Sequence, residues 1–532
     1  MATVSHPRIR PDILEERAYQ ESIAEAGVRS NTLVVLPTGL GKTAIALRVA
    51  AEYLLRQPTR SILLMAPTRP LVAQHARSVT TTLFCPPPLV FTGEISPDRR
   101  QVLLSPPQVV VATPQVIAND LAQGNFPLDT FSLVIFDEAH RAVGDYPYVA
   151  VGQAVRSTNA RVLAMTASPG SKLERIEAVW ANLGIEHFEI RGPTDADVAP
   201  YTHGIHLETV EVPLPPEVRN LGVYLRSVVQ RQSEVLHRLG YFPTVEAGRR
   251  ELLGLGITLR RQIDAAKRRG ETQEGRFWQA VSAQALGMKA LHGLVLAETQ
   301  GVEALRKYLA GRGTKKDGRL RPSDRAFLAD PDIVELQHQL ETLDLEHPKL
   351  AKAVEIVTQE IEKSPSARVI LFAHYRQTAD ALVERFAQVP HTPVRAARFV
   401  GQATHGSDMG LSQKQQVDVL DRFRRGEVNC LVATSVGEEG LDIPSTDLVV
   451  FYEPVPDEVR TIQRRGRTGR FRAGRVVVLI TAGTRDVGTF LSARRKEQRM
   501  HEMLEKVEAQ ARKGPLAPPA APQVQRMLDD FR

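Results

Sequence analysis

The stretch Leu33-Val34-Val35-Leu36-Pro37-Thr38-Gly39-Leu40-Gly41-Lys42-Thr43 joins a short apolar run to two closely spaced glycines and a lysine. Apolar residues then recur at helical spacing, which predicts a buried strand, a tight turn and a helix. In this geometry backbone N–H groups at the helix N-terminus point at phosphates, Lys42 supplies a positive charge and the Thr43 hydroxyl can ligate Mg²⁺. We therefore predict a site for ATP and Mg²⁺ formed by Pro37, Thr38, Gly39, Leu40, Gly41, Lys42 and Thr43.

Two adjacent carboxylates, Asp137 and Glu138, directly follow a second apolar run at residues 133–136. The run has the continuous apolar character of a strand buried on both faces of a parallel sheet. Because the carboxyl ends of parallel strands meet at one edge, we expect both side chains beside the phosphate site. Asp137 is predicted to hold Mg²⁺, and Glu138 to orient or deprotonate the attacking water. A solvated acidic cap is the plainer interpretation, but two motifs with one shared mechanism disfavour it.

The order of these motifs resembles that of superfamily-two helicases of the DEAH type, and within them the archaeal Hef and Fanconi anaemia group M branch. Two phrases carry the resemblance to this branch, Asp137-Glu138-Ala139-His140-Arg141-Ala142-Val143-Gly144 and His347-Pro348-Lys349-Leu350. The phosphate-binding segment also resembles the helicase form P-T-G-L-G-K-T, in which the first glycine of the strict pattern is absent, since Leu36 stands there. The resemblance covers nearly the whole chain and implies an ATP-hydrolysing motor that moves on nucleic acid.

The resemblance implies further roles residue by residue. Arg17 and Gln20 lie in a segment similar to the adenine-reading motif, and Asp442 corresponds to a ribose contact. Contacts to the nucleic-acid backbone are implied for Arg69, Thr113 and Thr434. The segment Thr166-Ala167-Ser168 resembles the motif that couples ATP to nucleic acid, and His140 is interpreted as a second link between the two.

An arginine-rich segment, Gln463-Arg464-Arg465-Gly466-Arg467-Thr468-Gly469-Arg470, resembles the motif whose arginines stabilise the charge developing on the γ-phosphoryl group. Arg467 and Arg470 would act in this way, because a guanidinium is always charged and can contact two phosphate oxygens. Gln463 would help to position water. Such runs are more often solvated or phosphate-binding patches, but the two glycines and the upstream segment 433–443 favour the catalytic interpretation.

Apolar runs divide the chain into two α/β parts. Runs at 33–36, 61–65, 109–111, 133–136 and 162–165 alternate with helical patterns, and so do runs at 369–372, 430–433, 448–451 and 476–480. This alternation predicts two doubly wound parallel sheets, which the resemblance identifies as RecA-like domains. We expect an ATP-binding domain at 1–205, a helical insert at 206–346, a second RecA-like domain at 347–500, and a helix with a proline-rich tail at 501–532.

The insert is expected to be all-helical and basic. Strand-like runs vanish beyond about residue 215, and residues 249–325 contain 17 Lys and Arg against 8 Asp and Glu, an excess larger than the net charge of +7 of the whole chain. This segment resembles the thumb-like insert of the Hef branch, which is associated with forked and crossed DNA. Cationic helices bind phosphates without reading sequence, and we expect contacts from Lys267, Arg268 and Arg269 and from the loop 311–319. The alternative is a helical bundle with a merely solvated surface.

Composition restricts the remaining possibilities. The chain has 532 residues and only two cysteines, Cys85 and Cys430, which excludes a disulfide framework, a four-cysteine zinc site and a cysteine-held iron–sulfur cluster. We expect no membrane-spanning segment, no membrane partner and a cytoplasmic location, on the nucleoid in a prokaryote. Trp180 and Trp278 are isolated, and both are interpreted as packing residues rather than as stacking platforms for bases.

These observations together predict an ATP-dependent DNA translocase that remodels branched DNA, such as stalled forks and Holliday junctions, in replication-coupled repair. A double-stranded RNA motor related to Dicer or the RNA-sensing helicases is the main alternative, because these share the motor and a comparable helical insert. A non-enzymatic scaffold is a third, but Lys42, Glu138 and Arg467 are all present. No E-R-K-x-x-x-D sequence occurs, so we expect the helicase portion alone and predict no nuclease activity.

The last residues contain one further motif. Gln525, Leu528 and Phe531 fit the pattern Q-x-x-L-x-x-F, which resembles the peptide by which archaeal repair enzymes dock on the sliding clamp PCNA. One helical turn would place Leu528 and Phe531 on the same side as an apolar plug. A frayed tail helix is the alternative.

Overall fold

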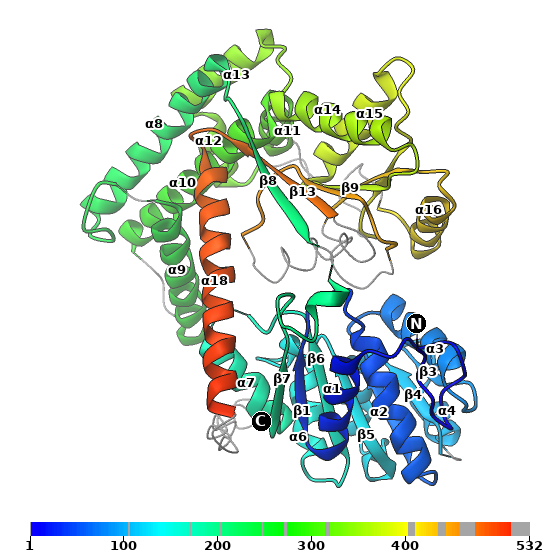
Figure 1. Cartoon of the computed structure of the whole chain (residues 1–532). Coiled ribbons are helices and arrows are strands. Elements are labelled where there is room, and N and C mark those ends of the chain that lie inside the picture. The colour runs from blue at the N-terminus through cyan, green and yellow to red at the C-terminus, as the bar shows by residue number, and fades with distance from the viewer. Residues whose placement is uncertain are drawn as a thin grey trace.

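Seven parallel strands form the sheet of the first α/β domain in the computed structural model (Figure 1). The structure describes residues 2–104, 107–170, 172–202, 204–246, 248–270, 274–313, 320–402, 410–434, 443–456 and 474–511. The strand order is β3-β4-β2-β5-β6-β1-β7. The strands are β1 (Thr32–Val35), β2 (Ser61–Met65), β3 (Leu89–Phe91), β4 (Val109–Ala112), β5 (Phe131–Asp137), β6 (Arg161–Thr166) and β7 (His187–Ile190). The five runs predicted as strands in this part of the chain are confirmed.

Helices cover both faces of this first sheet, as a doubly wound domain requires. α1, α2 and α3 pack on one face through side chains such as Ile23, Ile45 and Val72. α5, α6 and α7 pack on the other face through side chains that include Ile117 and Val151. The helices are α1 (Ala18–Arg29), α2 (Lys42–Arg56), α3 (Arg69–Thr82), α4 (Pro97–Leu103), α5 (Pro114–Ala122), α6 (Pro147–Val155) and α7 (Leu173–Leu183).

The second α/β domain has a six-stranded parallel sheet in the order β10-β11-β9-β12-β13-β8. Its strands are β8 (Ile205–Val212), β9 (Val369–Phe372), β10 (Ala396–Phe399), β11 (Cys430–Ala433), β12 (Leu448–Phe451) and β13 (Gly474–Thr481). α14 (Pro348–Lys363) and α15 (Arg376–Gln388) pack on one face. α16 (Gln413–Arg425) and the first turns of α18 (Arg485–Ala511) pack on the other. The predicted class of two parallel-sheet α/β domains is therefore confirmed.

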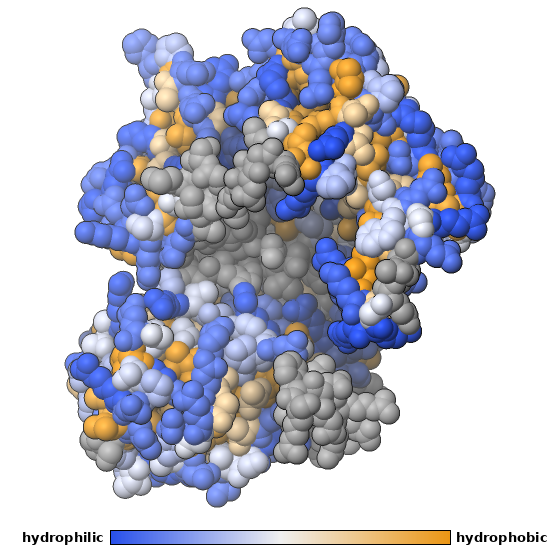
Figure 2. Space-filling view, turned by 180° about the vertical axis from the view of Figure 1, so that it is seen from behind, coloured by the Kyte–Doolittle hydropathy of each residue, from blue (hydrophilic) through white to orange (hydrophobic). Residues whose placement is uncertain are grey.

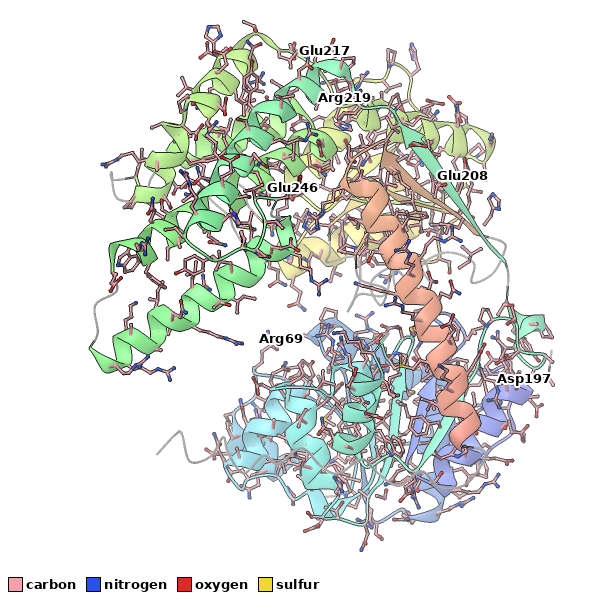
Figure 3. The ribbon with its side chains drawn as sticks, turned by 90° about the vertical axis from the view of Figure 1, so that its left-hand side faces the viewer. Arg69, Asp197, Glu208, Glu217, Arg219 and Glu246 are labelled. Atoms are coloured by element: carbon pink, nitrogen blue, oxygen red, sulfur yellow. The ribbon has the colours of Figure 1, made fainter. Side chains whose placement is uncertain are left out.

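Between β8 and α14 lies the helical insert, which consists of α8 (Pro216–Arg238), α9 (Arg249–Arg269), α10 (Gly275–Gln300), α11 (Val302–Gly313), α12 (Pro322–Leu328) and α13 (Pro331–Thr342). One apolar core joins α8, α10, α11, α12 and α13. A second, smaller core joins the end of α8 to α9 and to the start of α10. α9 and the start of α10 thus form an arm that has its own core and extends from the rest of the insert (Figure 3).

The central helix of the insert, α10, differs from one expectation. By length and composition alone it is apolar enough to cross a membrane, although no such segment was expected from the sequence. Almost half of its most apolar window is buried, and it packs against α8, α9, α11 and α12. The apolar composition follows from this central position, because a helix surrounded by others must be apolar on most sides.

Two segments cross between the α/β domains, and they place the domain borders differently from the expected division. β8 was expected to fall within the insert, but all eight of its residues pair with β13 at the edge of the second sheet. α18 starts on the second domain and runs back along the first, where Met500, Leu504 and Val507 enter the core beside α7 and β7 (Figure 1). The expected border at residue 500 therefore falls inside one continuous helix.

The segment His347-Pro348-Lys349 forms a buried connection between the insert and the second domain. Lys349 is fully buried, and its ammonium group pairs with Asp486 at the start of α18 and lies 5.6 Å from the centre of the Tyr452 ring. The His347 ring contacts the Glu298 carbonyl of α10 at 3.1 Å and accepts a bond from the Lys349 amide at 3.2 Å. Burial and the nearby Lys349 charge lower the pKa of His347 to about 4, so the ring is neutral at pH 7.

Replacing Lys349 by methionine is predicted to destabilise the second α/β domain by about 3 to 5 kcal/mol, because Asp486 would stay buried without a counter-charge. The free energy of unfolding in urea measures this effect. The double variant Lys349→Met with Asp486→Leu should recover most of the loss, since two apolar groups replace the pair. Lys352→Met, on the exposed side of the same helix, is the control and should cost less than about 0.5 kcal/mol. Equal stabilities for Lys349→Met and Lys352→Met would contradict the prediction.

Candidate functional site

The phosphate loop connects β1 to α2 in the predicted strand–turn–helix arrangement. Gly39 and Gly41 both have left-handed backbone angles, with φ of 86° and 81°. A Cβ on Gly41 would also lie only 2.4 Å from the amide nitrogen of Gln20, so both position and conformation require glycine there. α2 begins directly after this turn, so the N–H groups of its first turn, which a helix leaves without intrahelical partners, lie beside the loop, as a phosphate cradle requires.

The Lys42 ammonium group is folded over this loop. It donates to the carbonyl oxygen of Leu36 at 2.9 Å and to that of Pro37 at 3.4 Å. Its charge also acts on Asp137, which places the cation between the loop and the acidic strand end. The lysine is held by weak neutral acceptors at the position from which it would reach phosphate oxygens, and Thr43 follows it in the first turn of α2.

Gln20 and Tyr19 anchor the same loop from α1. The Tyr19 hydroxyl donates to the Leu40 carbonyl at 2.8 Å, and the Gln20 amide donates to the same oxygen at 3.2 Å. Arg17 pairs with Glu15 at 2.6 Å and stacks on the ring of Tyr201 at 4.9 Å. The structure thus places Gln20 against the backbone of the phosphate loop, and the adenine contact predicted for Arg17 and Gln20 remains a prediction.

The carboxylate of Asp137 lies at the carboxyl end of β5 in a set of contacts that sequence reasoning did not find. His75 of α3 contacts it at 2.8 Å, and the Glu138 amide donates to it at 3.0 Å. The Tyr148 hydroxyl donates to the Asp137 carbonyl at 2.7 Å. Burial opposes ionisation, but the hydrogen bond and charge of His75 and the charge of Lys42 hold the pKa of Asp137 below its usual range. Asp137 is therefore ionised and held in a fixed orientation, as the predicted role of a ligand for Mg²⁺ requires.

Glu138 differs from Asp137 because its carboxylate lacks a hydrogen-bond donor among the described residues. Its backbone is left-handed, with φ of 51°, which is uncommon for a residue with a side chain and is found at functional sites. Its Oε2 atom is buried without a hydrogen-bond partner, although it lies 3.3 Å from Nδ1 of His140. A buried acceptor without a donor is costly, and a water molecule in the site would satisfy it. The glycine cradle, Lys42, Asp137 and Glu138 together fit a bound ATP with Mg²⁺.

A chain of polar contacts leads from Glu138 to α18. His140 lies in a short 3₁₀ turn, η2 (Ala139–Arg141), and contacts the Thr166 hydroxyl at 3.1 Å. That hydroxyl donates to the Ser168 carbonyl at 3.1 Å, and the Ser168 hydroxyl contacts the Met500 sulfur at 2.9 Å. The segment predicted to couple ATP to nucleic acid, Thr166-Ala167-Ser168, therefore touches a helix that begins on the other α/β domain.

The site residues of the second domain are only partly covered by the structure. Thr434 follows β11, is buried, and donates its backbone N–H to the Phe399 carbonyl at 3.1 Å. The remaining predicted residues of this domain and of the tail lie outside the described residues, and their roles stay predictions: Asp442, Gln463, Arg467, Arg470, Gln525, Leu528 and Phe531.

The first domain presents its predicted nucleic-acid residues beside strand ends. Thr113 stands at the N-terminal boundary of α5 directly after β4 and is buried, whereas Arg69 begins α3 after β2 and pairs with Glu94 at 3.0 Å. Arg69 lies on the upper surface of this domain, facing the space below the insert (Figure 3). Seen from behind, the molecule is hollowed between the first domain and the two parts above it (Figure 2).

Charges in the insert are distributed unevenly. Toward its base several cations are paired with carboxylates: Arg226 with Glu298, Arg231 with Asp330 and Asp332, and Lys289 and Arg312 with Asp324. Along the arm, six exposed cations form no ion pair with the described residues: Arg250, Arg260, Arg261, Lys267, Arg268 and Arg276. Residues 249–270 and 274–283 of the arm contain eight Lys and Arg against three Asp and Glu, so the positive field of the insert is concentrated on the arm.

These features define a class of protein, the P-loop motor ATPase with paired α/β domains. Two family models match the chain, the DEAD/DEAH box helicase over residues 17–176 and the helicase conserved C-terminal domain over residues 351–472. The crystal structure of the Pyrococcus furiosus Hef helicase domain is similar, with a TM-score of 0.68, 39% identity, and coverage of 91% of this chain and 99% of that one. The chain belongs to the Hef and Fanconi anaemia group M family of DEAD/DEAH-box helicases, as the resemblance predicted.

Curated relatives extend well beyond the matched region. A putative ATP-dependent RNA helicase of Methanocaldococcus jannaschii is 36% identical over 94% of this chain, which covers 62% of that protein. The ATP-dependent DNA helicase mph1 of Neurospora crassa is 34% identical over 88% of this chain, which covers 41% of that protein. The Fanconi anemia group M protein of Gallus gallus is 32% identical over 90% of this chain, which covers 25% of that protein. The chain thus spans less than two thirds of these relatives.

The geometry supports hydrolysis of a phosphoanhydride. Bound ATP with Mg²⁺ would supply the bond to be cleaved and a cation that neutralises its charge. Lys42 and the N–H groups of α2 would bind phosphate oxygens, and Thr43 and Asp137 would hold the metal. Glu138 would accept a hydrogen bond from water with its unsatisfied oxygen, which would orient a nucleophile and provide a base.

Changing Glu138 to glutamine is predicted to lower the ATP turnover by about 100-fold or more while ATP still binds, because the orienting carboxylate is lost and the cradle is kept. Lys42→Ala should weaken ATP binding as well, since the cation on the phosphates is removed. Nucleotide affinity and hydrolysis are measured for both, with Glu52→Gln on α2 as the control for a carboxylate outside the site. Near-normal turnover in Glu138→Gln would refute its assignment.

Proposed function

We propose that this protein is an ATP-driven DNA translocase that binds branched DNA, such as stalled forks and Holliday junctions, and remodels it during replication-coupled repair. The candidate ATPase site supports a motor function, because the phosphate loop and the carboxylates Asp137 and Glu138 both follow the carboxyl ends of strands in the first sheet. The names of relatives such as mph1 support DNA as the track. Such a motor would work on the nucleoid, in the cytoplasm of a prokaryote.

The observation that carries the branched-DNA part is the excess of positive charge on the arm of the insert. A motor that only followed one duplex would need cations along its cleft, but this chain also places six unpaired cations on an arm that extends from the rest of the insert (Figure 3). Cations without acidic partners can exchange solvent counterions for phosphates at little cost. The arm is therefore suited to hold a second duplex arm, in addition to the strand that the two motors follow.

A double-stranded RNA motor is the second candidate, favoured by the relative from Methanocaldococcus jannaschii that is named as a putative RNA helicase. The DNA motor and the RNA motor can be distinguished by measuring how strongly forked DNA, linear duplex DNA, single strands and duplex RNA each stimulate ATP hydrolysis. Strongest stimulation by forked DNA is expected. Strongest stimulation by duplex RNA would replace the proposal with the RNA motor.

Neutralising the end of the arm tests its role. Changing Lys267, Arg268 and Arg269 together to glutamine should weaken binding of forked DNA by about tenfold or more at about 0.1 M salt, because up to three phosphate contacts are lost. The slope of log affinity against log salt concentration should shrink by about 2 to 3. Fluorescence anisotropy of labelled forks at several salt concentrations measures both quantities.

The control for the arm variant removes the same charge elsewhere. Arg29, Arg56 and Lys307 are exposed cations that already pair with carboxylates along their own helices. Changing these three to glutamine should leave the affinity and the salt slope close to those of the parent. If the arm variant also keeps the affinity and salt slope of the parent, the arm is a solvated surface.

For the tail, we propose docking on the sliding clamp PCNA through Gln525, Leu528 and Phe531, on the basis of their spacing alone. A peptide of residues 520–532 should bind the clamp, and its Leu528→Ala, Phe531→Ala version should bind much more weakly, because the apolar plug is removed. Calorimetric titration measures both affinities. Equal affinities of the two peptides, or no binding by either, would contradict the proposal that the tail docks on the clamp.

A further inference from the structure

The arm of the insert carries an exposed tryptophan. Trp278 lies in the first turn of α10 and is 51% exposed, so it is not a core residue, although its ring packs against that of Phe277. Trp180, by contrast, is 8% exposed, donates its indole N–H to the Ile185 carbonyl at 2.7 Å and packs edge-on against Phe188, so its interpretation as a packing residue is confirmed. An indole is large and apolar, and leaving half of it in water forgoes burial that would stabilise the fold.

The ring of Trp278 packs against a buried neighbour, Phe277. Its ring meets the ring of Phe277 at 83°, with 5.6 Å between the centres. Phe277 is buried in the small core of the arm together with Leu252, Leu255 and Leu259. The exposed indole therefore stands on a fixed support and is presented to solvent at little further cost in side-chain entropy.

The indole lies on the same pair of helices as the unpaired cations of the arm. α9 and α10 run antiparallel, because Gln284 of α10 donates to the Leu252 carbonyl at 3.0 Å and α10 starts where α9 ends. Moving back along α10 from Gln284 to Trp278 therefore leads toward the later part of α9, which carries Arg260, Arg261, Lys267 and Arg268. Arg276 precedes Trp278 by two residues on α10.

None of these cations covers the indole. The other exposed aromatic side chain of the described residues, Phe84, has the Arg10 guanidinium over its ring at 4.9 Å. For Trp278 the described residues provide no cation over the ring and no acceptor for the indole N–H. Its face and its polar edge are both available to a partner that offers an aromatic ring, a negative charge and a hydrogen-bond acceptor together.

We propose that Trp278 stacks on an unpaired nucleobase where the strands of a DNA branch separate. The inference rests on the proposed function and adds the chemical group that the arm recognises. Only nucleic acid with bases outside the helical stack offers an aromatic face beside phosphates, because in an intact duplex the faces are covered by their neighbours. The cations hold the two phosphate backbones, and the indole marks the point at which pairing ends.

The test compares a forked DNA with a blunt duplex of the same number of base pairs, and uses the parent protein and the variants Trp278→Ala, Trp278→Phe and Val334→Ala. Val334 is 53% exposed on α13 and serves as the control for loss of an exposed apolar side chain elsewhere on the insert. Trp278→Ala should weaken fork binding by about 5- to 150-fold, the range expected for one base stacked on an aromatic ring, and should leave duplex binding unchanged. Trp278→Phe should retain most of the fork affinity.

A spectroscopic measurement gives an independent readout. Fork binding should quench part of the tryptophan emission of the parent, and the quenching should vanish in Trp278→Phe, in which only the buried Trp180 remains. A fork affinity unchanged in Trp278→Ala, an equal loss on fork and blunt duplex, or no quenching would overturn the inference while the parent still binds forks. A parent that binds no DNA would overturn the proposed function together with it.

Discussion

The pairing of β8 with β13 sets the arrangement of the whole molecule. β8 leaves the first α/β domain and adds to the edge of the second sheet along all eight of its residues. The helical insert that follows must then start and end on the second domain. The same edge leads into α18, which returns to the first domain and buries Met500, Leu504 and Val507 there. Each domain thus holds a segment that continues from the other, and any opening between them must bend or slide these two connections.

The strands and motifs that could be predicted from the sequence are those whose signal is local. β5 is apolar along its length because both faces of its sheet are covered, and its last residue, Asp137, is placed at the strand edge by the parallel topology. β8 was not predicted as a strand, because its side chains are mostly exposed or half-buried and its residues alternate between apolar and polar. An edge strand of that kind has the composition of a linker, and only its pairing with β13 distinguishes it.

Sequence patterns also missed contacts between distant residues. His75 and Tyr148 fix the carboxylate and the carbonyl of Asp137, yet neither belongs to a recognisable motif, because each acts through a single side chain that reaches the end of β5 from its own helix. The exposure of Trp278 was missed for a similar reason. Residues 277 and 280 of α10 face the core of the arm, while residue 278 points about 100° away from the first of them, and an aromatic pair in sequence does not say which ring is inside.

One rigid element connects the insert to the ATP site. α18 has 27 residues, which is about 40 Å of helix. Near its start, Asp486 pairs with Lys349 in the buried connection that also holds the Glu298 carbonyl of α10. Farther along, Met500 contacts Ser168, which lies in the same chain of polar contacts as Glu138. A shift of α18 relative to the first domain must therefore break or remake the contact at Ser168, which is linked to Glu138 through Thr166 and His140. A displacement of the insert and a change at the candidate ATP site would thus both act on one helix.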